Sequence, residues 1–417
     1  MFNDQNSDPM LRVTLIAGTY QPDRCGVAHY TSRLREALAK EVEPVVLTTQ
    51  AAAQAVQDTH IRGVVQDWRL ASLLPLVRTI QTTPTDILHI QHAAGTYSFQ
   101  RPIFLLPLIL RALGYRQPIV TTVHEYGWWE WQPKGVPPKL LEWLKQWGQQ
   151  HQWWDREDGF LLTGSQAIIT TNVEAESAIC DRLPHLSNRL YRIPIAANVE
   201  VAPIERSLAR QLVRQTYGWS EESLVIAFFG FLHPVKGLEN LFLAFKQIQA
   251  IVPQARLLLV GGVESLALPA DEAKRYWDKL QAQISQLGLS EQVKMTGYVS
   301  EAIASHYLSG SDLGVLPFNH GVTLKSGSLL ALLAHHLPTV AAYSDPPDPE
   351  LAAANIVCPV PSRDPDSLTA ALLKLIENPD LQKQLSVAGS EFVRQFSWEA
   401  IAQKHLQIYK NLLAKQI

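Results

Sequence analysis

Hydrophobic and polar positions alternate between two patterns along most of the chain. Short unbroken apolar runs are typical of strands buried on both faces of a parallel sheet, and helical spacing of apolar residues separates many of them. In the first half, the predicted strands are Leu11–Ala17, Pro44–Thr49, Ile87–Gln91, Pro118–His124, Phe160–Thr163 and Ala167–Thr171, with helices over 69–81, 102–114 and 139–151. In the second half, the predicted strands are Leu224–Phe231, Arg256–Val260, Gln292–Thr296, Leu313–Pro317 and Thr339–Tyr343.

This alternation predicts an α/β protein with two doubly wound, Rossmann-like parallel sheets, each covered by helices. Residues 199–207 break the pattern with a proline and no periodicity, so we expect one lobe over residues 1–200 and a second over 201–397. Open parallel sheets bind ligands at the carboxyl ends of their strands, so two facing lobes would place the active site in the cleft between them.

Composition narrows the class of protein. A chain of 417 residues with 47% hydrophobic side chains has enough apolar material for two cores. The net charge of −3 argues against nucleic acid as a partner. The three cysteines lie far apart and show neither metal spacing nor a disulfide framework. We found no signal-peptide pattern and no apolar run long enough to cross a bilayer, which predicts a cytoplasmic protein, with membrane association left open.

The stretch LVIAFFGFLHPVKGLENLFLAFK, residues 224–246, contains the clearest candidate ligand site. A buried strand ends at Gly230, and apolar residues at helical spacing begin at Leu238. Lys236 and Gly237 lie where the strand turns into the helix, so a positive charge stands beside unpaired N–H groups and the glycine lets an anion approach. The pattern predicts phosphate binding without a Walker loop. A solvated lysine in a βα turn explains the local pattern equally well.

Several stretches, spread over nearly the whole chain and in the same order, resemble the family 4 glycosyltransferases, which have the B-type two-lobed fold. In the first half they are TYQPDRCGVAHYTSRLREAL, ILHIQHAAGTYSF, PIVTTVHEYG and YRIPIAANV. In the second half they are FFGFLHPVKGLENLFLAF, LPFNHGVTLKSGSLLALLAHHLPTVAA and FSWEAIAQKHLQIYKNLL. Each stretch alone is weakly specific, and the fold assignment depends on their number and order.

The resemblance implies transfer of a sugar, of hexosyl type, from a nucleotide-diphosphate donor to a saccharide or glycolipid acceptor. It implies retention at the anomeric carbon and a role in envelope or exopolysaccharide synthesis. The donor would bind mainly to the second lobe and the acceptor to the first, onto which the helix at 398–417 would pack. No metal and no cofactor are expected, because cationic side chains and helix N-termini would stabilise the leaving diphosphate.

The donor segment departs from the family pattern. The family carries two glutamates eight positions apart, and the matching positions here are Thr323 and Ala331, so ribose recognition differs or is lost. The family's arginine after the glycine is replaced by Phe231, and His233 or, preferably, Lys325 would take its place. Lys325 belongs to TLKSGS, a helix start with hydroxyls and free N–H groups that form a second anion cradle. The predicted donor-binding residues are Gly230, His233, Lys236, Lys325, Ser326, Gly327 and Ser328. Simple capping of the helix explains Ser326 or Ser328 equally well.

The first lobe supplies the catalytic candidate. His124 ends the strand of PIVTTVHEYG, and by resemblance it would face the donor sugar and hydrogen-bond it. His89 alternates with apolar positions and is interpreted as a hydrogen-bonded core residue. The predicted acceptor-binding residues are Gly26, His92, Glu125, Trp128 and Trp129.

Seven of the eleven tryptophans lie between Trp128 and Trp154. Trp143 and Trp147 share one helix face and are expected to form a small satellite core. Trp128 and Trp129 occupy a loop beyond His124, where they would stack on a sugar acceptor or enter a membrane interface. We prefer the acceptor platform, because acidic neighbours offset much of the local positive charge.

The pattern Asp364-Pro-Asp366 matches the D-x-D motif that binds metal–diphosphate in other glycosyltransferases. It precedes the helical run SLTAALLKLIEN, so Asp366 or Ser367 is better explained as a helix N-cap.

Three functions remain open: an active glycosyltransferase, a non-catalytic nucleotide-sugar-binding protein, and a nucleotide-sugar epimerase on the same fold. The missing glutamates motivate the second. Lys236 and the TLKSGS helix start favour the first. The expected partners are a nucleotide-sugar donor and a saccharide or glycolipid acceptor, with a peripheral membrane contact as an open alternative.

Overall fold

The computed structural model describes residues 10–127, 130, 132, 135–264 and 269–415. The chain divides into two compact units, residues 1–195 with 398–417, and residues 196–397. The division between 195 and 196 lies close to residue 200, where the sequence pattern placed it.

The first unit is built on a seven-stranded sheet with strand order β3-β2-β1-β4-β5-β6-β7, and all the paired strands are parallel. Its strands are β1 (Leu11–Ala17), β2 (Val42–Thr49), β3 (Ile61–Val65), β4 (Ile87–His92), β5 (Ile119–Val123), β6 (Ala167–Thr170) and β7 (Leu190–Arg192). The central strands β4, β5 and β6 are buried at every position, as apolar runs without alternation predict.

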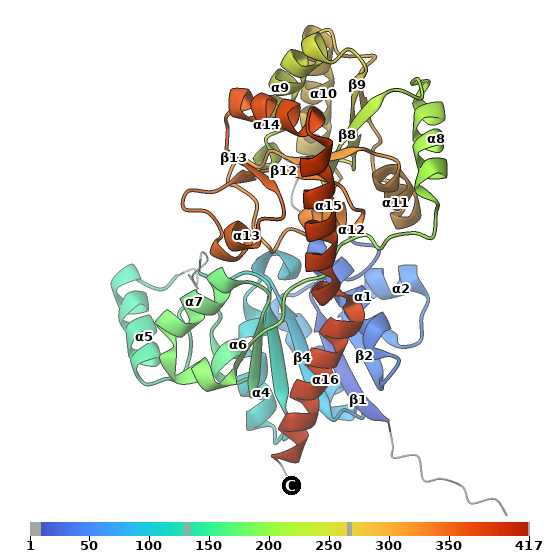
Figure 1. Cartoon of the computed structure of the whole chain (residues 1–417). Coiled ribbons are helices and arrows are strands. Elements are labelled where there is room, and N and C mark those ends of the chain that lie inside the picture. Colours follow the sequence, from blue (N-terminus) through green and yellow to red (C-terminus); the bar gives the residue numbers. More distant parts are fainter. Residues whose placement is uncertain (1–9, 128–129, 131, 133–134, 265–268, 416–417) are drawn as a thin grey trace, which may run out of the picture. The chain divides into compact units, whose positions relative to one another are not determined.

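Helices cover this sheet, and the helix at the end of the chain lies beside α1 (Figure 1). The α-helices are α1 (Gly26–Leu38), α2 (Gln50–Val56), α3 (Leu73–Thr82), α4 (Leu106–Ala112), α5 (Pro138–Gln150), α6 (Phe160–Thr163), α7 (Val173–Arg182) and α16 (Trp398–Ala414). The 3-10 helices among the described residues of this unit are η1 (Leu70–Ser72), η2 (Ala94–Tyr97), η3 (Pro102–Leu105) and η4 (Pro184–Arg189).

The second unit contains a six-stranded parallel sheet with strand order β10-β9-β8-β11-β12-β13. Its strands are β8 (Leu224–Phe229), β9 (Ala255–Val260), β10 (Val293–Met295), β11 (Leu313–Leu316), β12 (Thr339–Tyr343) and β13 (Cys358–Pro361). The strand order reverses between β8 and β11. Such a switch point is where open parallel sheets bind ligands.

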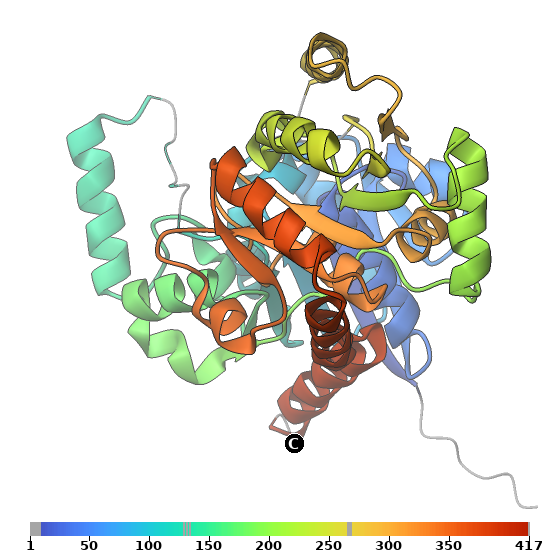
Figure 2. The same cartoon turned by 45° about the horizontal axis from the view of Figure 1, so that its top comes forward.

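Helices α9 and α14 pack side by side on the second unit (Figure 2). The α-helices are α8 (Arg206–Tyr217), α9 (Leu238–Ile251), α10 (Ala270–Gln286), α11 (Glu301–Ser309), α12 (Gly327–Ala334), α13 (Pro349–Ala354), α14 (Pro365–Ile376) and α15 (Pro379–Val393), and the 3-10 helices are η5 (Pro234–Lys236) and η6 (Arg394–Phe396). The predicted α/β class with two Rossmann-like sheets is therefore confirmed. None of the described helices is both long and apolar enough to cross a lipid bilayer.

One predicted strand is wrong. Residues 160–163 form α6, a single helical turn, although Leu161 and Leu162 are fully buried as a strand core would be. Gly159, with φ of 58°, redirects the chain immediately before it. A four-residue apolar run has no measurable period, so its burial was predicted correctly and its conformation was not.

Candidate active site

The first candidate site lies where β8 turns into α9. Gly230 follows β8 with φ of 132°, and Gly237 precedes α9 with φ of 68°, values that side chains other than glycine rarely adopt. Between them η5 ends at Lys236. The Val235 N–H donates a hydrogen bond to His233 Nδ1 at 3.3 Å, so His233 caps η5. The turn presents Lys236 at the carboxyl end of β8, as predicted from the sequence.

The ammonium group of Lys236 lies 3.6 Å from the ring centroid of Phe318, which follows β11. Among the described residues, no oxygen accepts a hydrogen bond from Lys236 Nζ and no carboxylate pairs with it. Burial lowers the pKa of Lys236 to about 8. Burial and the charge of Lys236 together lower the pKa of His233. A half-buried cation that faces a ring and has no oxygen partner is suited to bind an anion.

A second cationic segment leads from β11 into α12. Lys325 is exposed in this loop. The Leu329 N–H donates to Ser326 Oγ at 3.3 Å, which confirms that Ser326 caps α12. The Leu324 N–H donates to Asp348 Oδ2 at 3.1 Å, while the other oxygen of Asp348 accepts from the first turn of α13. Asp348, which the sequence did not indicate, therefore fastens the loop that carries Lys325.

The two predicted donor segments meet at the switch point. A Cβ atom on Gly230 would lie 2.6 Å from Ser328 Oγ, so the first turn of α12 packs against the end of β8. A Cβ atom on Gly237 would collide with the carbonyl oxygen of Pro317, so the start of α9 packs against the end of β11. The carboxyl ends of β8 and β11 therefore bring together Gly230, Lys236 and Ser328. Their role in donor binding stays a prediction.

Two close contacts near the carboxyl ends of these strands were not predicted. A Cβ atom on Gly327 would collide with the side chain of Asn198, which gave no signal in the sequence. A Cβ atom on Gly261 would collide with the carbonyl oxygen of Gly230, and the Leu232 N–H donates to the Gly262 carbonyl at 2.9 Å. A pair of glycines directly after the apolar run of β9 was the available signal for this second contact.

The positions of the missing glutamates have ordinary structural roles. The Thr323 carbonyl accepts a hydrogen bond from the Ser326 N–H at 3.0 Å. Ala331 is fully buried in α12, and its carbonyl accepts from His335 Nδ1 at 2.7 Å. Neither position offers a carboxylate to a ribose.

The catalytic candidate of the first unit lies directly after β5. His124 is half-buried, and its Nε2 is 2.9 Å from Gln91 Oε1 on β4. Its ring packs edge-on against Tyr30 of α1, with centroids 4.8 Å apart. Burial, with a smaller contribution from the nearby imidazoles of His92 and His405, lowers the pKa of His124 to about 3. His124 is therefore a neutral hydrogen-bonding group at neutral pH.

Two further histidines on β4, His89 and His92, lie in the core of the first unit. His89 is fully buried and hydrogen-bonded to Thr122 at 2.7 Å and to Tyr409 at 2.6 Å, which confirms the interpretation as a satisfied core residue. His92, predicted to bind acceptor, has a side chain only 2% exposed, with Nε2 3.0 Å from Asp158 Oδ1. In this conformation the His92 ring does not reach the surface.

The remaining acceptor predictions lie on exposed positions or outside the described part of the chain. Gly26 begins α1, and a Cβ atom there would meet nothing within 4 Å. Glu125 is exposed directly after His124. Trp128 and Trp129 lie outside the described residues. The structure thus leaves room for a ligand at Gly26 and Glu125.

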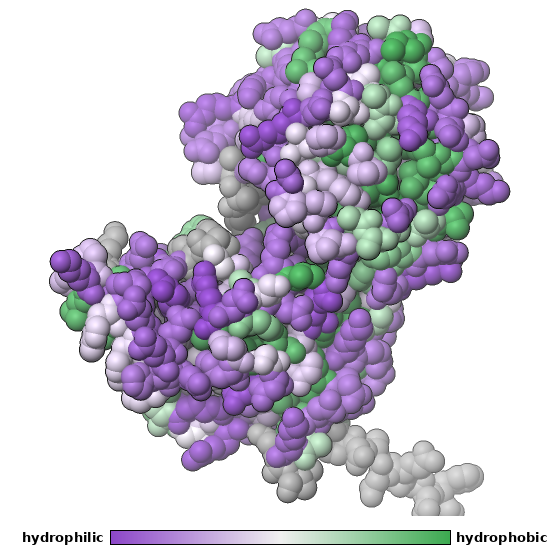
Figure 3. Space-filling model, turned by 60° about the vertical axis from the view of Figure 1, so that its left-hand side comes forward, coloured by the Kyte–Doolittle hydropathy of each residue, from purple (hydrophilic) through white to green (hydrophobic). Residues whose placement is uncertain are grey.

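The tryptophan pair on α5 does not form a core. Trp143 and Trp147 share one helix face, and their rings stack with centroids 6.4 Å apart. Trp143 is 57% exposed and Trp153, whose ring packs on Trp147, is 62% exposed. The predicted satellite core is therefore wrong, since the rings pack on one another at the surface. In Figure 3 the first unit shows mostly hydrophilic residues with small separate hydrophobic groups, whereas larger hydrophobic groups gather on the second unit.

The carboxylates of the D-x-D pattern are engaged in structural hydrogen bonds. Asp364 caps α14 by accepting from the Ser367 N–H at 2.9 Å and from the Ser367 hydroxyl at 2.6 Å. The cap is thus Asp364 and not Asp366 or Ser367, because the helix begins at Pro365, two residues before the predicted run SLTAALLKLIEN. Asp366 accepts from Gln247 at 2.8 Å. Among the described residues, no group of three or more histidine, cysteine or acidic side chains could hold a metal ion.

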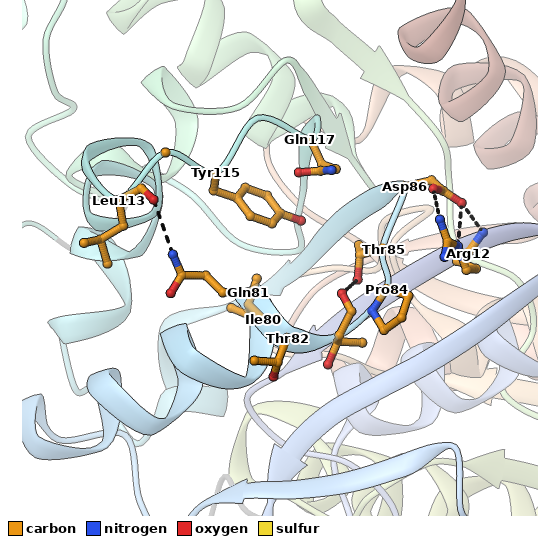
Figure 4. Close-up of a pocket in the computed structure, with 12 residues that line it drawn as sticks. Arg12, Ile80, Gln81, Thr82, Pro84, Thr85, Asp86, Leu113, Tyr115 and Gln117 are labelled. Carbon is orange, nitrogen blue, oxygen red and sulfur yellow. Dashed lines mark hydrogen bonds and ion pairs between the residues drawn. The ribbon is translucent and has the colours of Figure 1, made fainter.

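A separate pocket of about 450 Å³ lies at the amino ends of β1, β4 and β5 (Figure 4). Arg12 forms part of the pocket wall, and its guanidinium donates two hydrogen bonds to Asp86, at 2.7 and 3.1 Å. Gln81 donates to the Leu113 carbonyl at 3.4 Å on another side. Because ligands of parallel sheets bind at the carboxyl ends of strands, this pocket is distinct from the candidate site.

Two Rossmann-like units, each with a parallel sheet, are the architecture of the glycosyltransferase B class of fold. Solved structures of this class are similar over nearly the whole chain. HepE of Anabaena, solved with UDP and glucose, has a TM-score of 0.68 at 15% identity and covers 96% of this chain and 100% of its own. A glycosyltransferase of Rickettsia africae has a TM-score of 0.71 at 13% identity, with 97% and 99% covered. These likenesses establish the fold.

The sequence of the second unit matches a known protein family. Residues 209–392 match the family model for glycosyl transferases of group 1. Phosphatidyl-myo-inositol mannosyltransferase of Mycobacterium leprae is 26% identical, over 61% of this chain and 62% of the relative. The next three curated relatives are matched over only 42% to 46% of their length. A GDP-mannose-dependent phosphatidylinositol monomannoside mannosyltransferase of Corynebacterium glutamicum is 22% identical over 96% of this chain and 98% of the relative.

Proposed function

We propose that the chain transfers a sugar from a nucleoside-diphosphate donor to a saccharide or glycolipid acceptor, with retention at the anomeric carbon. The observation that carries the proposal is the Lys236 ammonium, which faces Phe318 at the switch point of a group 1 glycosyltransferase domain. The names of relatives that act on phosphatidylinositol glycolipids and on lipopolysaccharide core support a glycolipid or envelope acceptor. HepE, which shares the fold and was solved with UDP, supports a nucleoside diphosphate as the donor's leaving group.

In this proposal the second unit binds the diphosphate. Lys236 supplies one charge beside η5, and Lys325 supplies a second beside the capped start of α12. The free N–H groups of α12 add the partial positive charge of a helix N-terminus. Charge that develops on the leaving diphosphate would be stabilised by these fixed groups. His124 would hydrogen-bond the sugar as a neutral group.

A nucleotide-sugar screen tests this function. We expect the nucleotide sugars of one nucleoside diphosphate to raise the melting temperature of the protein, because a ligand at a hundred times its Kd stabilises a protein by about 2.7 kcal/mol. The stabilising nucleotide sugar should then release its nucleoside diphosphate faster when saccharide or glycolipid acceptors are added. Product mass spectrometry would identify the transferred sugar. Release that never exceeds the rate without protein, for every nucleotide sugar, would contradict the proposed activity.

A non-catalytic nucleotide-sugar-binding protein is the second candidate. Thr323 and the buried Ala331 replace the two family glutamates, and this observation favours it. The same screen separates the two candidates. A melting shift with no release of nucleoside diphosphate supports a binding protein, and acceptor-dependent release supports a transferase.

We also propose that a divalent metal is dispensable. In this proposal lysines, rather than a metal ion, neutralise the charge of the diphosphate. Asp364 and Asp366 already accept hydrogen bonds from Ser367 and Gln247. Transfer is expected to persist in excess EDTA at a rate within about twofold of the untreated protein. A loss that manganese or magnesium restores would contradict this and return the aspartates to consideration.

We propose that the acceptor binds to the first unit, against its aromatic residues. Trp143 on α5 and Trp153 just after it are exposed. The predicted platform residues, Trp128 and Trp129, lie outside the described part of the chain. Exposed indole rings stack on the apolar face of a sugar. A lipid interface is the alternative contact for the same rings, and binding to vesicles compared with soluble saccharides distinguishes the two.

A further inference from the structure

His124 is the end of a buried hydrogen-bonded network made of Tyr409, His89, Gln91 and His124. Gln91 Oε1 is 2.9 Å from His124 Nε2, and the Gln91 amide nitrogen is 3.2 Å from His89 Nε2. The other nitrogen of His89, Nδ1, is 2.6 Å from the hydroxyl of Tyr409. Tyr409, His89 and Gln91 are fully buried. The network connects β4 and β5 to α16, so the terminal helix contributes to the setting of His124.

The positions of the hydrogen atoms follow along this network. An amide oxygen only accepts hydrogen bonds, so His124 Nε2 must be the protonated nitrogen. A neutral imidazole carries one N–H, so His124 Nδ1 is left with a lone pair. Burial keeps the ring neutral by lowering the pKa of His124 to about 3. No described residue is hydrogen-bonded to His124 Nδ1.

The same orientation of the Gln91 amide sets the hydrogen positions at its other end. Its N–H group donates to His89 Nε2, so His89 carries its own hydrogen on Nδ1 and donates it to Tyr409. The Thr122 hydroxyl lies 2.7 Å from the same His89 Nε2. Rotating the amide by half a turn would reverse the donor and acceptor at every link.

We propose that Gln91, His89 and Tyr409 are positioning residues that hold His124 as the Nε2–H tautomer, so that Nδ1 acts only as an acceptor for a sugar hydroxyl. The hydroxyl-bearing ligand rests on the proposed function, whereas the tautomer belongs to the free protein. A lone pair repels an anionic oxygen. The network therefore selects a neutral sugar with a hydroxyl at this position over a sugar that carries a carboxylate there.

Nitrogen-15 NMR of the full chain with labelled histidine tests the tautomer directly, because protonated and unprotonated ring nitrogens have well-separated shifts. The His124 signals are identified by their loss in His124→Gln. We expect an unprotonated Nδ1 and a protonated Nε2. A protonated Nδ1 in the native protein overturns the proposal, since it means that the Gln91 amide has the opposite orientation.

Two variants test the network itself. Gln91→Leu removes both links and should convert the single tautomer into a mixture. Tyr409→Phe removes only the distant hydroxyl and should shift the His124 signals in the same direction with the fold intact. Tyr115→Phe is the matched control, because the buried Tyr115 hydroxyl has no partner among the described residues. Unchanged His124 signals in both Gln91→Leu and Tyr409→Phe overturn the positioning role.

A kinetic measurement then connects the tautomer to the sugar. For the nucleotide sugar that the screen identifies, Gln91→Leu should raise KM about tenfold. It should also reduce the preference of the protein for this nucleotide sugar over the matching nucleotide hexuronate. An unaltered preference overturns the selective role of Nδ1. If no nucleotide sugar is turned over at all, the proposed function fails, while the NMR result still decides the tautomer.

Discussion

Replacing Lys236 by alanine is expected to weaken nucleoside-diphosphate binding by about ten- to a hundredfold. A hydrogen bond to a charged group contributes about 1.5–3 kcal/mol, and each 1.4 kcal/mol is a factor of ten in Kd. The loss should be close to the full value, because the Lys236 ammonium has no competing oxygen partner among the described residues. Isothermal calorimetry with the nucleoside diphosphate measures it.

The matched control for Lys236→Ala is Lys246→Ala. Lys246 is exposed on α9, the same helix, and lies away from the switch point. The control removes one positive charge from the same unit and should leave Kd within about twofold. Equal affinities of Lys236→Ala and Lys246→Ala would mean that Lys236 does not contact the diphosphate.

The same lysine predicts a pH dependence with a definite sign. Burial lowers the pKa of Lys236 to about 8, so the free protein loses this charge as the pH rises through that value. A bound anion favours the charged form, so binding takes up a proton above that pH and affinity falls between about pH 7 and about pH 9. Lys236→Arg should bind with a nearly flat profile, because a guanidinium stays charged. An equally steep fall in Lys236→Arg would assign the titration to another group.

The sequence predicted the central strands well, and of the edge strands it predicted only β10, as Gln292–Thr296. Leu11–Ala17 and Thr339–Tyr343 have the predicted bounds, because each is a continuous apolar run between polar segments. The strands that were not predicted, β3, β7 and β13, all lie at the edge of a sheet. Edge strands are short and partly exposed, and β13 contains two prolines, which only an edge position tolerates. Such strands lack the apolar run that marks a buried strand.

The sequence predicted which strand ends carry the candidate site, but it did not predict which distant residues contact them. Lys236 and the start of α12 were found because each follows an apolar strand of a parallel sheet. The contacts of Asn198 with Gly327 and of Asp348 with Leu324 were not, because nothing in local spacing brings such distant residues together. The link from His89 to Tyr409 spans 320 positions, and only the packing of α16 reveals it.

Gly237 and Gly218 together distinguish the cost of backbone strain from the cost of close packing. Gly237 and Gly218 have nearly the same backbone angles, φ 68° and ψ 27° against φ 65° and ψ 28°. A Cβ atom on Gly218 would meet nothing within 4 Å, whereas a Cβ atom on Gly237 would collide with the carbonyl oxygen of Pro317. Alanine at either position costs about 1–2 kcal/mol for the left-handed conformation.

Gly237→Ala is therefore expected to lose about 1–3 kcal/mol more of the free energy of unfolding than Gly218→Ala, as is typical of forcing an atom into a packed region. The backbone must shift at the contact between the start of α9 and the end of β11, which carry Lys236 and Phe318. Diphosphate binding should weaken in Gly237→Ala and stay unchanged in Gly218→Ala. Thermal melting and calorimetry on the two variants measure both effects. Equal melting temperatures and equal affinities would show that the end of β11 moves freely and that the corner is not held by this contact.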